Sequence, residues 1–505
     1  MVQIVATVSL IFFIVLMVGI GIFSIRRASS LDGFLLGGRN IGPWLSAFAY
    51  GTSYFSAVIF IGYAGMHGWN IGLPSMWIGV GNALIGSLLA WVVLARKTRR
   101  MTHRLDARTM PEFFSARYDS RPMKIYTAAI IFIFLVPYAA SVYKGLGTMF
   151  SAIYGGADPL ICMLIVAILT GIYLVLGGYV ATALTDFIQG LVMVIGILMM
   201  IGILVTRPEV GGLTQVIPRL AAIDPQLVNI TGGSNSSFLM INILLTSLGV
   251  WGLPQMVHKY YAIKDESNIR LATIISTAFC VIISVGAYFT GSLSKLFLQA
   301  QPNGMPDVVG GYDNVMPTLL MQALSQSVFS MIVLSVILLL LLSASMSTLA
   351  AVVLSSSSAV SVDLIGEVHP NIQEKSQMRL LRFLCLIFVA LSYLFAAMNI
   401  SFIVNLMSFS WGVVAGSFIG PFIWGLYWKG TTKAGAWAGL LSGIVVVGGL
   451  LIYNCMTIGF TAAKSFAPQF GVAAMVVSIV IVPIVSLITK KYSAEHVENA
   501  FSPAE

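Results

Sequence analysis

Hydroxyl side chains recur through one apolar stretch of the chain, residues 343–358. Serine and threonine are dense there, and no carboxylate follows before Asp363. Hydroxyl and free carbonyl oxygens are suitable ligands for a small, hard cation such as Na⁺. The alternative is that each hydroxyl hydrogen-bonds to the carbonyl one turn earlier in its own helix, as is common in membrane helices. A cation site therefore needs free carbonyls from a second segment.

Two other apolar stretches carry sequences that interrupt a helix and so release carbonyls. Residues 47–56 combine small and hydroxyl side chains, and residues 247–254 contain a Gly-x-x-Gly-x-Pro sequence. Proline removes a backbone donor, and non-helical backbone persists within a membrane only where protein or water supplies partners. Close helix packing is the other use of small residues. We expect two broken helices, with carbonyls of 47–56 facing the hydroxyls of 343–358.

The composition indicates the kind of helix in which these apolar stretches lie. Only 9% of the 505 residues are charged, 58% are hydrophobic, and the mean hydropathy is +0.94. Soluble proteins carry about 25% charged residues, so a soluble enzyme, a nucleic-acid-binding domain and a disordered chain are excluded. Apolar runs of about 20 residues predict an all-α polytopic membrane protein. We expect about thirteen transmembrane helices, at 3–25, 42–66, 72–95, 125–153, 159–177, 184–206, 237–257, 271–298, 326–360, 380–398, 402–427, 435–455 and 468–489.

The basic residues predict how the chain is oriented in the membrane. The first span has no basic residue before it and is followed by Arg26 and Arg27, which is the reverse of a secretory signal. With thirteen spans, most of the 27 Lys and Arg residues fall in loops on one side. Basic loops stay in the cytoplasm. We therefore expect a multi-pass protein of the cell inner (plasma) membrane, with its N-terminus outside and its C-terminus cytoplasmic.

The spacing of the two breaks predicts the domain organisation. The second and seventh spans are five helices apart, and matched broken helices in two halves are typical of inverted-repeat transporters. We expect a 5+5 inverted repeat with peripheral helices at both ends of the chain. The expected parts are an N-terminal helix and loop (1–41), a first repeat (42–206), an extracellular loop (207–236), a second repeat (237–427), and two C-terminal helices with a short tail (428–505).

Several motifs follow one another in a definite order between about residues 30 and 445. They are Leu36-Gly37-Gly38-Arg39 with Gly42-Pro43, Thr185-Asp186 with Gln189-Gly190, Ser345-Met346-Ser347-Thr348, and Gly420-Pro421 followed by Ala434-Gly435-Ala436 and Ala438-Gly439. In this order they resemble the sodium:solute symporter family, and among its members the bacterial sodium/proline and sodium/pantothenate symporters. The resemblance implies the fold of the bacterial leucine transporter, working by alternating access.

The same resemblance implies a sodium site that agrees with the cation site expected from the residues. Its ligands would be three backbone carbonyls and two hydroxyls. They are the carbonyls of Thr52, Phe55 and Ala344 and the hydroxyls of Ser347 and Thr348. Asp186 would serve sodium release or a second cation. Ala350 and Ala351 stand where some members carry further hydroxyls, which favours one Na⁺ per cycle.

The resemblance also implies that the solute lies between the two breaks. The candidate side chains are Tyr54, Ser56, Trp251, Gln255 and Ser410. Proline transporters carry an aspartate where Tyr54 stands, which argues against proline. Ordinary helix packing is the alternative role for Tyr54 and Trp251.

Lys144 is the only basic residue deep inside a predicted span, since Lys295 and Arg382 lie within three positions of a span end. A charge at that depth is costly and suggests a function, such as pairing with a substrate carboxylate. The alternative is that its long side chain reaches the membrane surface.

These features predict a sodium-coupled secondary active symporter rather than an enzyme. It would import a small organic solute, with carboxylates such as an amino acid, pantothenate or a monocarboxylate as the candidates. The partners would be that solute, Na⁺ and the lipid bilayer, with no nucleic acid and no obligate protein partner. No GxxxxGK[ST] motif is found, which argues against an ATP-driven pump. The alternative is a sodium-dependent solute sensor without net transport.

Overall fold

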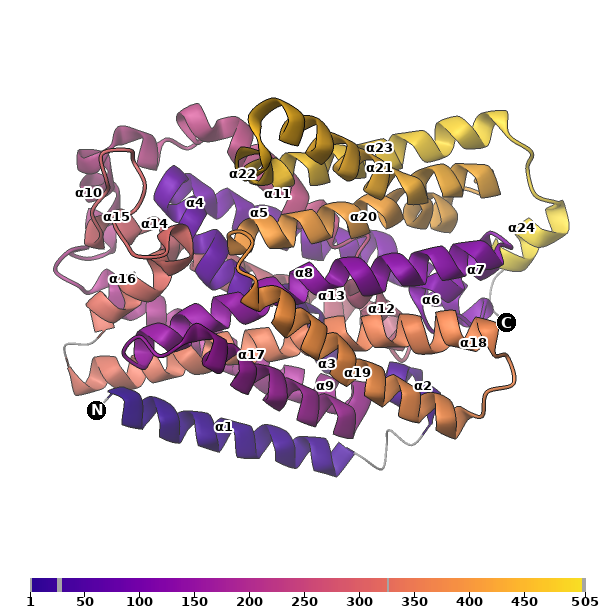
Figure 1. Ribbon diagram of the computed structural model, residues 1–505, viewed down its shortest axis with the longest axis horizontal. Helices are drawn as coiled ribbons and strands as arrows, with labels where there is room; N and C mark the ends of the chain where they lie inside the picture. Colours follow the sequence, from indigo (N-terminus) through magenta and orange to yellow (C-terminus); the bar gives the residue numbers. More distant parts are fainter. Residues whose placement is uncertain (1, 25–29, 325–326, 502–505) are drawn as a thin grey trace.

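The computed structural model describes residues 2–24, 30–324 and 327–501, and these are nearly all helical. Most of the long helices run side by side along the long axis of the molecule (Figure 1). Among the described residues, eleven helices are long and apolar enough to cross a membrane, or up to twelve with one bent pair. The predicted span at 159–177 corresponds to a shorter apolar helix, Pro159–Ile172. The all-α membrane fold is confirmed, and the count of thirteen stays a prediction.

The helices fall into long rods and shorter pieces. The long ones are α1 (Val2–Ser24), α8 (Arg121–Ile153), α9 (Pro159–Val205), α17 (Val328–Ser358), α19 (Glu374–Ala397), α20 (Ile403–Tyr427), α21 (Lys433–Ile458) and α23 (Ala467–Ile488). The shorter ones are α2 (Leu31–Leu36), α3 (Pro43–Tyr54), α4 (Ala64–Ile71), α5 (Met76–Ala83), α6 (Arg96–Arg104), α7 (Met110–Arg117), α10 (Val216–Ile223), α11 (Ser236–Gly249), α12 (Pro254–Ala262), α13 (Ser267–Cys280), α14 (Gly286–Ser292), α15 (Ser294–Phe297), α16 (Val315–Leu324), α18 (Gly366–Val368), α22 (Phe460–Ala463) and α24 (Ala494–Phe501).

Both predicted helix breaks are present. The helix α3 ends at Tyr54, and Phe55 is extended, with φ −111° and ψ 122°. The chain then enters a π-helical turn, Val58–Tyr63, that continues into α4, and the segment Val58–Ile71 is bent by 47° from α3. At the second break α11 ends at Gly249, and Leu253 is extended before α12 begins. Both breaks release backbone groups in the middle of the bundle.

Glycines let the second break lie against α20. A Cβ atom on Gly252 would lie 3.0 Å from backbone atoms of Ala415 and Ile419, and one on Gly249 would lie 2.8 Å from the ring of Trp411. Such close approach needs residues without side chains at the contact. The Gly-x-x-Gly spacing therefore serves packing as well as the break.

The helix α9 contains two apolar segments, Pro159–Ile172 and Gly178–Val205, joined by a kink in place of the expected loop. It runs through the predicted loop between 177 and 184, with one non-helical residue, Gly178, at φ 54° and ψ −153°. A Cβ at Gly178 would lie 2.6 Å from the ring of Phe34, so both the positive φ and the contact require glycine. One residue thus makes the kink for which the sequence predicted a loop.

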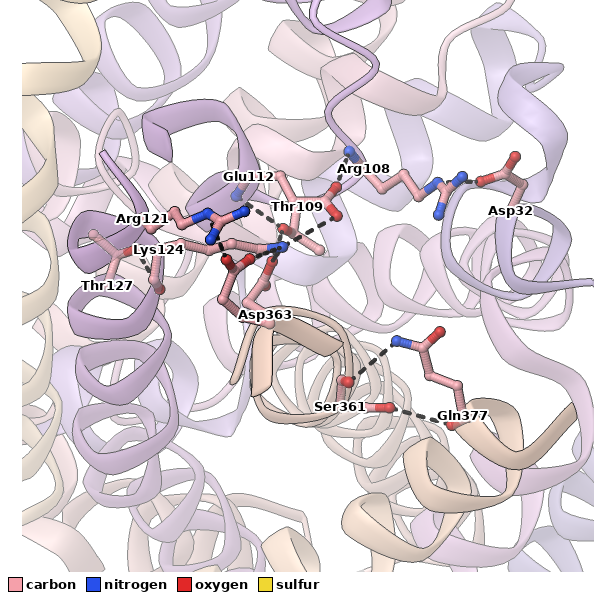
Figure 2. A network of polar contacts seen from close by, with 11 residues as sticks. Asp32, Arg108, Thr109, Glu112, Arg121, Lys124, Thr127, Ser361, Asp363 and Gln377 are labelled. Carbon is pink, nitrogen blue, oxygen red and sulfur yellow. Dashed lines mark hydrogen bonds and ion pairs between the residues drawn. The ribbon is translucent and has the colours of Figure 1, made fainter. Parts of the chain in front are cut away.

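The helices α6, α7 and α24 lie at one end of the bundle (Figure 1), which is called here the basic end because α6 is rich in Arg and Lys. There the ammonium of Lys124 lies 3.8 Å from carboxylate oxygens of Glu112 and Asp363. It lies 3.5 Å from Glu367, and the hydroxyl of Thr109 donates to Asp363 at 2.8 Å (Figure 2). This network ties the start of α8 to α7 and to the segment that follows α17.

Candidate functional site

The hydroxyl of Thr348 on α17 meets the carbonyls released at the end of α3. Its Oγ1 lies 3.3 Å from the carbonyl oxygen of Thr52, 3.2 Å from that of Ser53 and 3.5 Å from that of Phe55. It also lies 3.0 Å from the carbonyl of Ala344, one turn earlier in its own helix. Oγ1 of Thr348 therefore bonds to a carbonyl of its own helix and also faces the carbonyls at the end of α3.

The neighbouring Ser347 joins the same group of oxygens. Its hydroxyl donates to Oγ1 of Thr52 at 2.8 Å, and Thr52 in turn donates to the carbonyl of Phe48 at 2.7 Å. Thr52, Ser347 and Thr348 are all fully buried. The structure thus brings the five sodium-ligand candidates into one cluster. The cluster, called here the hydroxyl–carbonyl cluster, consists of Thr52, Phe55, Ala344, Ser347 and Thr348.

The donor set of this cluster suits an alkali cation. It offers hydroxyl and carbonyl oxygens only, and Oγ of the adjacent Ser53 is buried without a hydrogen-bond partner. Among the described residues, no group of three or more His, Cys, Asp or Glu side chains could hold a metal ion. Uncharged oxygens from a broken helix and a facing helix match the way that transporters hold Na⁺.

Asp186 on α9 is buried and faces a lysine that the sequence analysis missed. Its Oδ2 lies 3.8 Å from Nζ of Lys259 on α12, and neither carboxylate oxygen accepts a hydrogen bond from the described residues. Lys259 also lies over the ring of Tyr179, 5.1 Å from its centroid. The seventh span was expected to end at 257 and so excluded this lysine. The sequence does hold one indication that Lys259 belongs to the site. It lies four residues after the candidate Gln255, and therefore on the same helical face.

Tyr54 and Ser56 line a cavity beside the hydroxyl–carbonyl cluster. It adjoins the first break, and the empty space there amounts to about 300 Å³ when the part open to solvent is included. The phenol of Tyr54 donates to the carbonyl of Thr246 at 2.7 Å, and its ring lies 6.4 Å from that of Trp411 at 26°. Trp411 also lines the cavity but was not predicted. The lining residues are Tyr54, Phe55, Ser56, Val58, Ile59, Tyr63, Asn82, Tyr138, Thr246, Tyr288, Met407 and Trp411.

Three other substrate candidates do not line this cavity. The indole of Trp251 donates to the carbonyl of Ile85 at 3.0 Å. Ser410 donates to the carbonyl of Phe134 at 2.5 Å. Gln255 is buried, and neither atom of its amide has a hydrogen-bond partner. The structure brings two of the five predicted break-region candidates to the cavity wall.

Lys144 lies outside the cavity in an ion pair. Its ammonium is 2.8 Å from Oδ2 of Asp313 and donates to the carbonyl of Ser401 at 2.7 Å. Burial raises the pKa of Asp313, and the Lys144 ammonium opposes that rise. Asp313 belongs to a long connection between predicted spans, and nothing in its sequence context marked it as a partner. The charge of Lys144 is thus compensated within the protein.

A model of the sodium:solute symporter family matches residues 34–443. The chain belongs to the sodium:solute symporter family. Members are secondary transporters coupled to Na⁺, so Na⁺ is the coupling ion and the protein is a multi-pass membrane symporter. The fold and the hydroxyl–carbonyl cluster agree with that membership.

Relatives of the symporter cover nearly its whole length. It is 27% identical over 488 residues to the osmoregulated proline transporter OpuE of Bacillus subtilis, covering 96% of this chain and 95% of that protein. It is 28% identical over 494 residues to sodium/proline symporters of Staphylococcus aureus, covering 96% and 92% of the two chains.

Solved structures share the fold of the symporter. A Na⁺-coupled sialic acid symporter in a substrate-bound outward-open state matches with a TM-score of 0.79 at 17% identity, over 97% of this chain and 99% of the other. A transporter of the nucleobase-cation-symport-1 family in a closed conformation matches with a TM-score of 0.53 at 13% identity, over 92% and 97%. At these identities the likeness shows the fold, which is of the leucine-transporter type.

Proposed function

We propose that the protein imports a small organic solute together with Na⁺ by alternating access. The observation that carries this proposal is the meeting of the Thr348 hydroxyl with the carbonyls freed at the end of α3. The cation would bind at the hydroxyl–carbonyl cluster, with Ser347 and Thr348 as hydroxyl ligands. One Na⁺ per cycle is proposed.

Coupling follows from the short segment that the cluster and the cavity share. The carbonyls of Thr52 and Phe55 face the cluster, whereas the side chains of Tyr54 and Ser56 line the cavity. A cation that draws the two carbonyls toward α17 fixes the segment between them. Fixing that segment positions the cavity wall, so cation binding and solute binding stabilise the same conformation.

The solute proposal rests on the cavity wall and on the relatives. Tyr54 and Ser56 are the proposed contacts, because they line the cavity and the other three break-region candidates do not. A carboxylate such as an amino acid, pantothenate or a monocarboxylate remains the proposed class. Proline is included because the relatives in two bacteria are proline transporters.

Asp186 is proposed to assist release of Na⁺ from the cluster. One turn further along α9, a Cβ atom on Gly190 would lie 3.1 Å from Cγ2 of Thr52, so this part of α9 adjoins the cluster. Lys259 provides a positive charge beside the Asp186 carboxylate. An ion that moves from the cluster toward Asp186 meets a carboxylate already paired with an ammonium, which weakens its hold on the ion. We expect Asp186→Asn to slow the release of ²²Na⁺ from the loaded protein.

The moving parts and the orientation are also proposals. Residues 42–206 and 237–427 would form the two inverted repeats, with 1–41, 207–236 and 428–505 outside them. The basic end would face the cytoplasm, and the N-terminus would lie outside. The helix α1 begins at the end of the bundle opposite α24 (Figure 1), which supports termini on opposite faces. Import of one Na⁺ gains about 2.3 kcal/mol per 100 mV of membrane potential.

Uptake into proteoliposomes tests the proposal. Proline, pantothenate, small monocarboxylates, sialic acid and glucose would each be supplied with an inward Na⁺ gradient and, as the control, with K⁺ in place of Na⁺. We expect one solute to accumulate with Na⁺ alone. Accumulation that is equal in K⁺ would overturn the coupling.

A further inference from the structure

The cavity beside the first break is walled mainly by aromatic rings. Six of its lining side chains are aromatic, and they come from five separate elements. The ring of Trp411 lies 5.7 Å from that of Tyr138 at 78°, and the ring of Tyr54 lies 4.4 Å from that of Phe55 at 12°. The aromatic lining residues, called here the aromatic wall, are Tyr54, Phe55, Tyr63, Tyr138, Tyr288 and Trp411.

No charged side chain lines the cavity among the described residues. The ammonium of Lys144 is paired with Asp313, and Asp186 is paired with Lys259. A solute carrying a net charge would therefore be buried without a counter-ion from a lining side chain, which is costly. A bound Na⁺ next to the cavity adds to the cost for a cationic solute. The cavity accordingly selects a solute whose own charges cancel.

Several oxygen acceptors at the cavity wall are already engaged. The amide oxygen of Asn82 accepts from Thr246 at 2.7 Å and from Ser247 at 3.3 Å. The carbonyl of Thr246 accepts from Tyr54, and the hydroxyls of Tyr63 and Ser408 pair with each other at 3.2 Å. A primary ammonium has three N–H donors that need acceptors, and it would have to share these acceptors with the donors already bonded to them. An ammonium whose hydrogens are replaced by alkyl groups needs none.

Aromatic faces bind such an alkylated ammonium directly. A cation within about 6 Å of a ring centroid is attracted by the ring quadrupole, and quaternary ammonium groups are recognised by cages of aromatic rings. The aromatic wall supplies such faces, and Nε1 of Trp411 has no hydrogen-bond partner. The opposite charge of a zwitterion, the carboxylate, is served at the break, where Na⁺ would bind next to the cavity.

We propose that the solute is a compact zwitterion with a carboxylate and a fully alkylated ammonium group, held by the aromatic wall. This proposal rests on the proposed sodium symport and names the substrate class of that same cavity. Trp411 is its main specificity-determining residue, because it packs against both Tyr54 and Tyr138.

Uptake of a graded set of solutes into proteoliposomes tests this class. The set is glycine betaine, proline, alanine, choline and acetate, each with an inward Na⁺ gradient and with K⁺ in its place. We expect glycine betaine to accumulate with Na⁺, and its half-saturation concentration to be at least about ten-fold lower than that of proline, which keeps two N–H donors. Alanine, choline and acetate are expected to be poorer still.

Variants of Trp411 distinguish binding of the solute by the aromatic wall from a purely structural role of this side chain. Trp411→Leu removes the ring face and is expected to raise the half-saturation for glycine betaine at least about ten-fold, whereas Trp411→Phe keeps a face and loses less. Trp437, which packs on Tyr126 away from the cavity, gives the matched control Trp437→Leu with unchanged uptake. Binding of ²²Na⁺ to the purified Trp411→Leu protein without solute is expected to match the wild type.

The possible results separate this proposal from the symport proposal. Sodium-driven accumulation of alanine, acetate or proline in preference to glycine betaine would overturn the proposed substrate class and leave the symport proposal standing. If no member of the set accumulates, the proposed substrate class is also overturned. If glycine betaine accumulates to the same level with K⁺ as with Na⁺, the proposed substrate class is supported and the sodium coupling is overturned.

Discussion

At the scale of the residue, two hydroxyls on α17 carry the cation hypothesis. Ser347 and Thr348 were singled out from the sequence because hydroxyls are dense there, and the resemblance named their carbonyl partners. The structure adds distances of 2.8 to 3.5 Å between their oxygens and those of Thr52, Ser53 and Phe55. These residues lie nearly 300 positions apart, so spacing within either segment could not have given that contact.

Removing either hydroxyl should weaken sodium activation. Ser347→Ala and Thr348→Ala are each expected to raise the half-saturation for Na⁺ at least about ten-fold, since each removes one of about five oxygen ligands. Ser335→Ala is the matched control, because Ser335 lies on the same helix and donates only to the carbonyl of Met331. Uptake at graded Na⁺ concentrations measures the effect. A half-saturation that stays at the wild-type value in both variants would remove this cation site.

Lys144 shows where sequence reasoning reached a residue but missed its partner. Its position inside a span marked it as costly, and the structure supplies Asp313 as the compensating charge. Lys144→Gln should destabilise the protein by about 3–5 kcal/mol, since it leaves a buried carboxylate unpaired. The double variant Lys144→Gln/Asp313→Asn should regain most of that loss. Thermal unfolding in detergent gives both values, and an unchanged midpoint for Lys144→Gln would contradict the buried pair.

At the scale of the element, the two broken helices follow from local sequence. Small and hydroxyl residues end α3 at Tyr54, and a Gly-x-x-Gly-x-Pro sequence separates α11 from α12. Local composition could predict these breaks because they depend on backbone chemistry. It could not predict that α9 passes through an expected loop by means of Gly178 alone, because the contact with Phe34 that fixes this kink is distant in sequence.

The close packing of the second break against α20 can be tested by adding a methyl group to a glycine. Gly252→Ala places a Cβ atom 3.0 Å from backbone atoms of α20, so it should destabilise the protein by about 1–3 kcal/mol and reduce uptake. Gly448→Ala is the matched control, because no atom lies within 4 Å of its added Cβ, and it should be neutral or stabilising by about 0.5–1 kcal/mol. If thermal unfolding finds the two variants equally stable, the close approach of the break to α20 is wrong.

At the scale of the whole molecule, composition and hydropathy already placed the protein in a membrane, and motif order indicated its family. The distribution of charge predicted one basic end, and the structure gathers α6, α7 and α24 there, with Lys124 bridging three carboxylates (Figure 2). The residues that sequence alone did not yield are Trp411, Asp313 and Lys259. Each becomes notable only through a partner on another element.

The central claim is that the hydroxyl–carbonyl cluster and the cavity share the segment Thr52–Ser56 and therefore stabilise each other's occupied state. Linkage requires that two ligands coupled in this way raise each other's affinity by the same factor. The direct measurement is equilibrium binding of ²²Na⁺ to the purified protein with and without the transported solute, alongside binding of that labelled solute with and without Na⁺. We predict two equal factors above one, both abolished in Thr348→Ala. Sodium affinity that ignores a saturating solute would contradict the account.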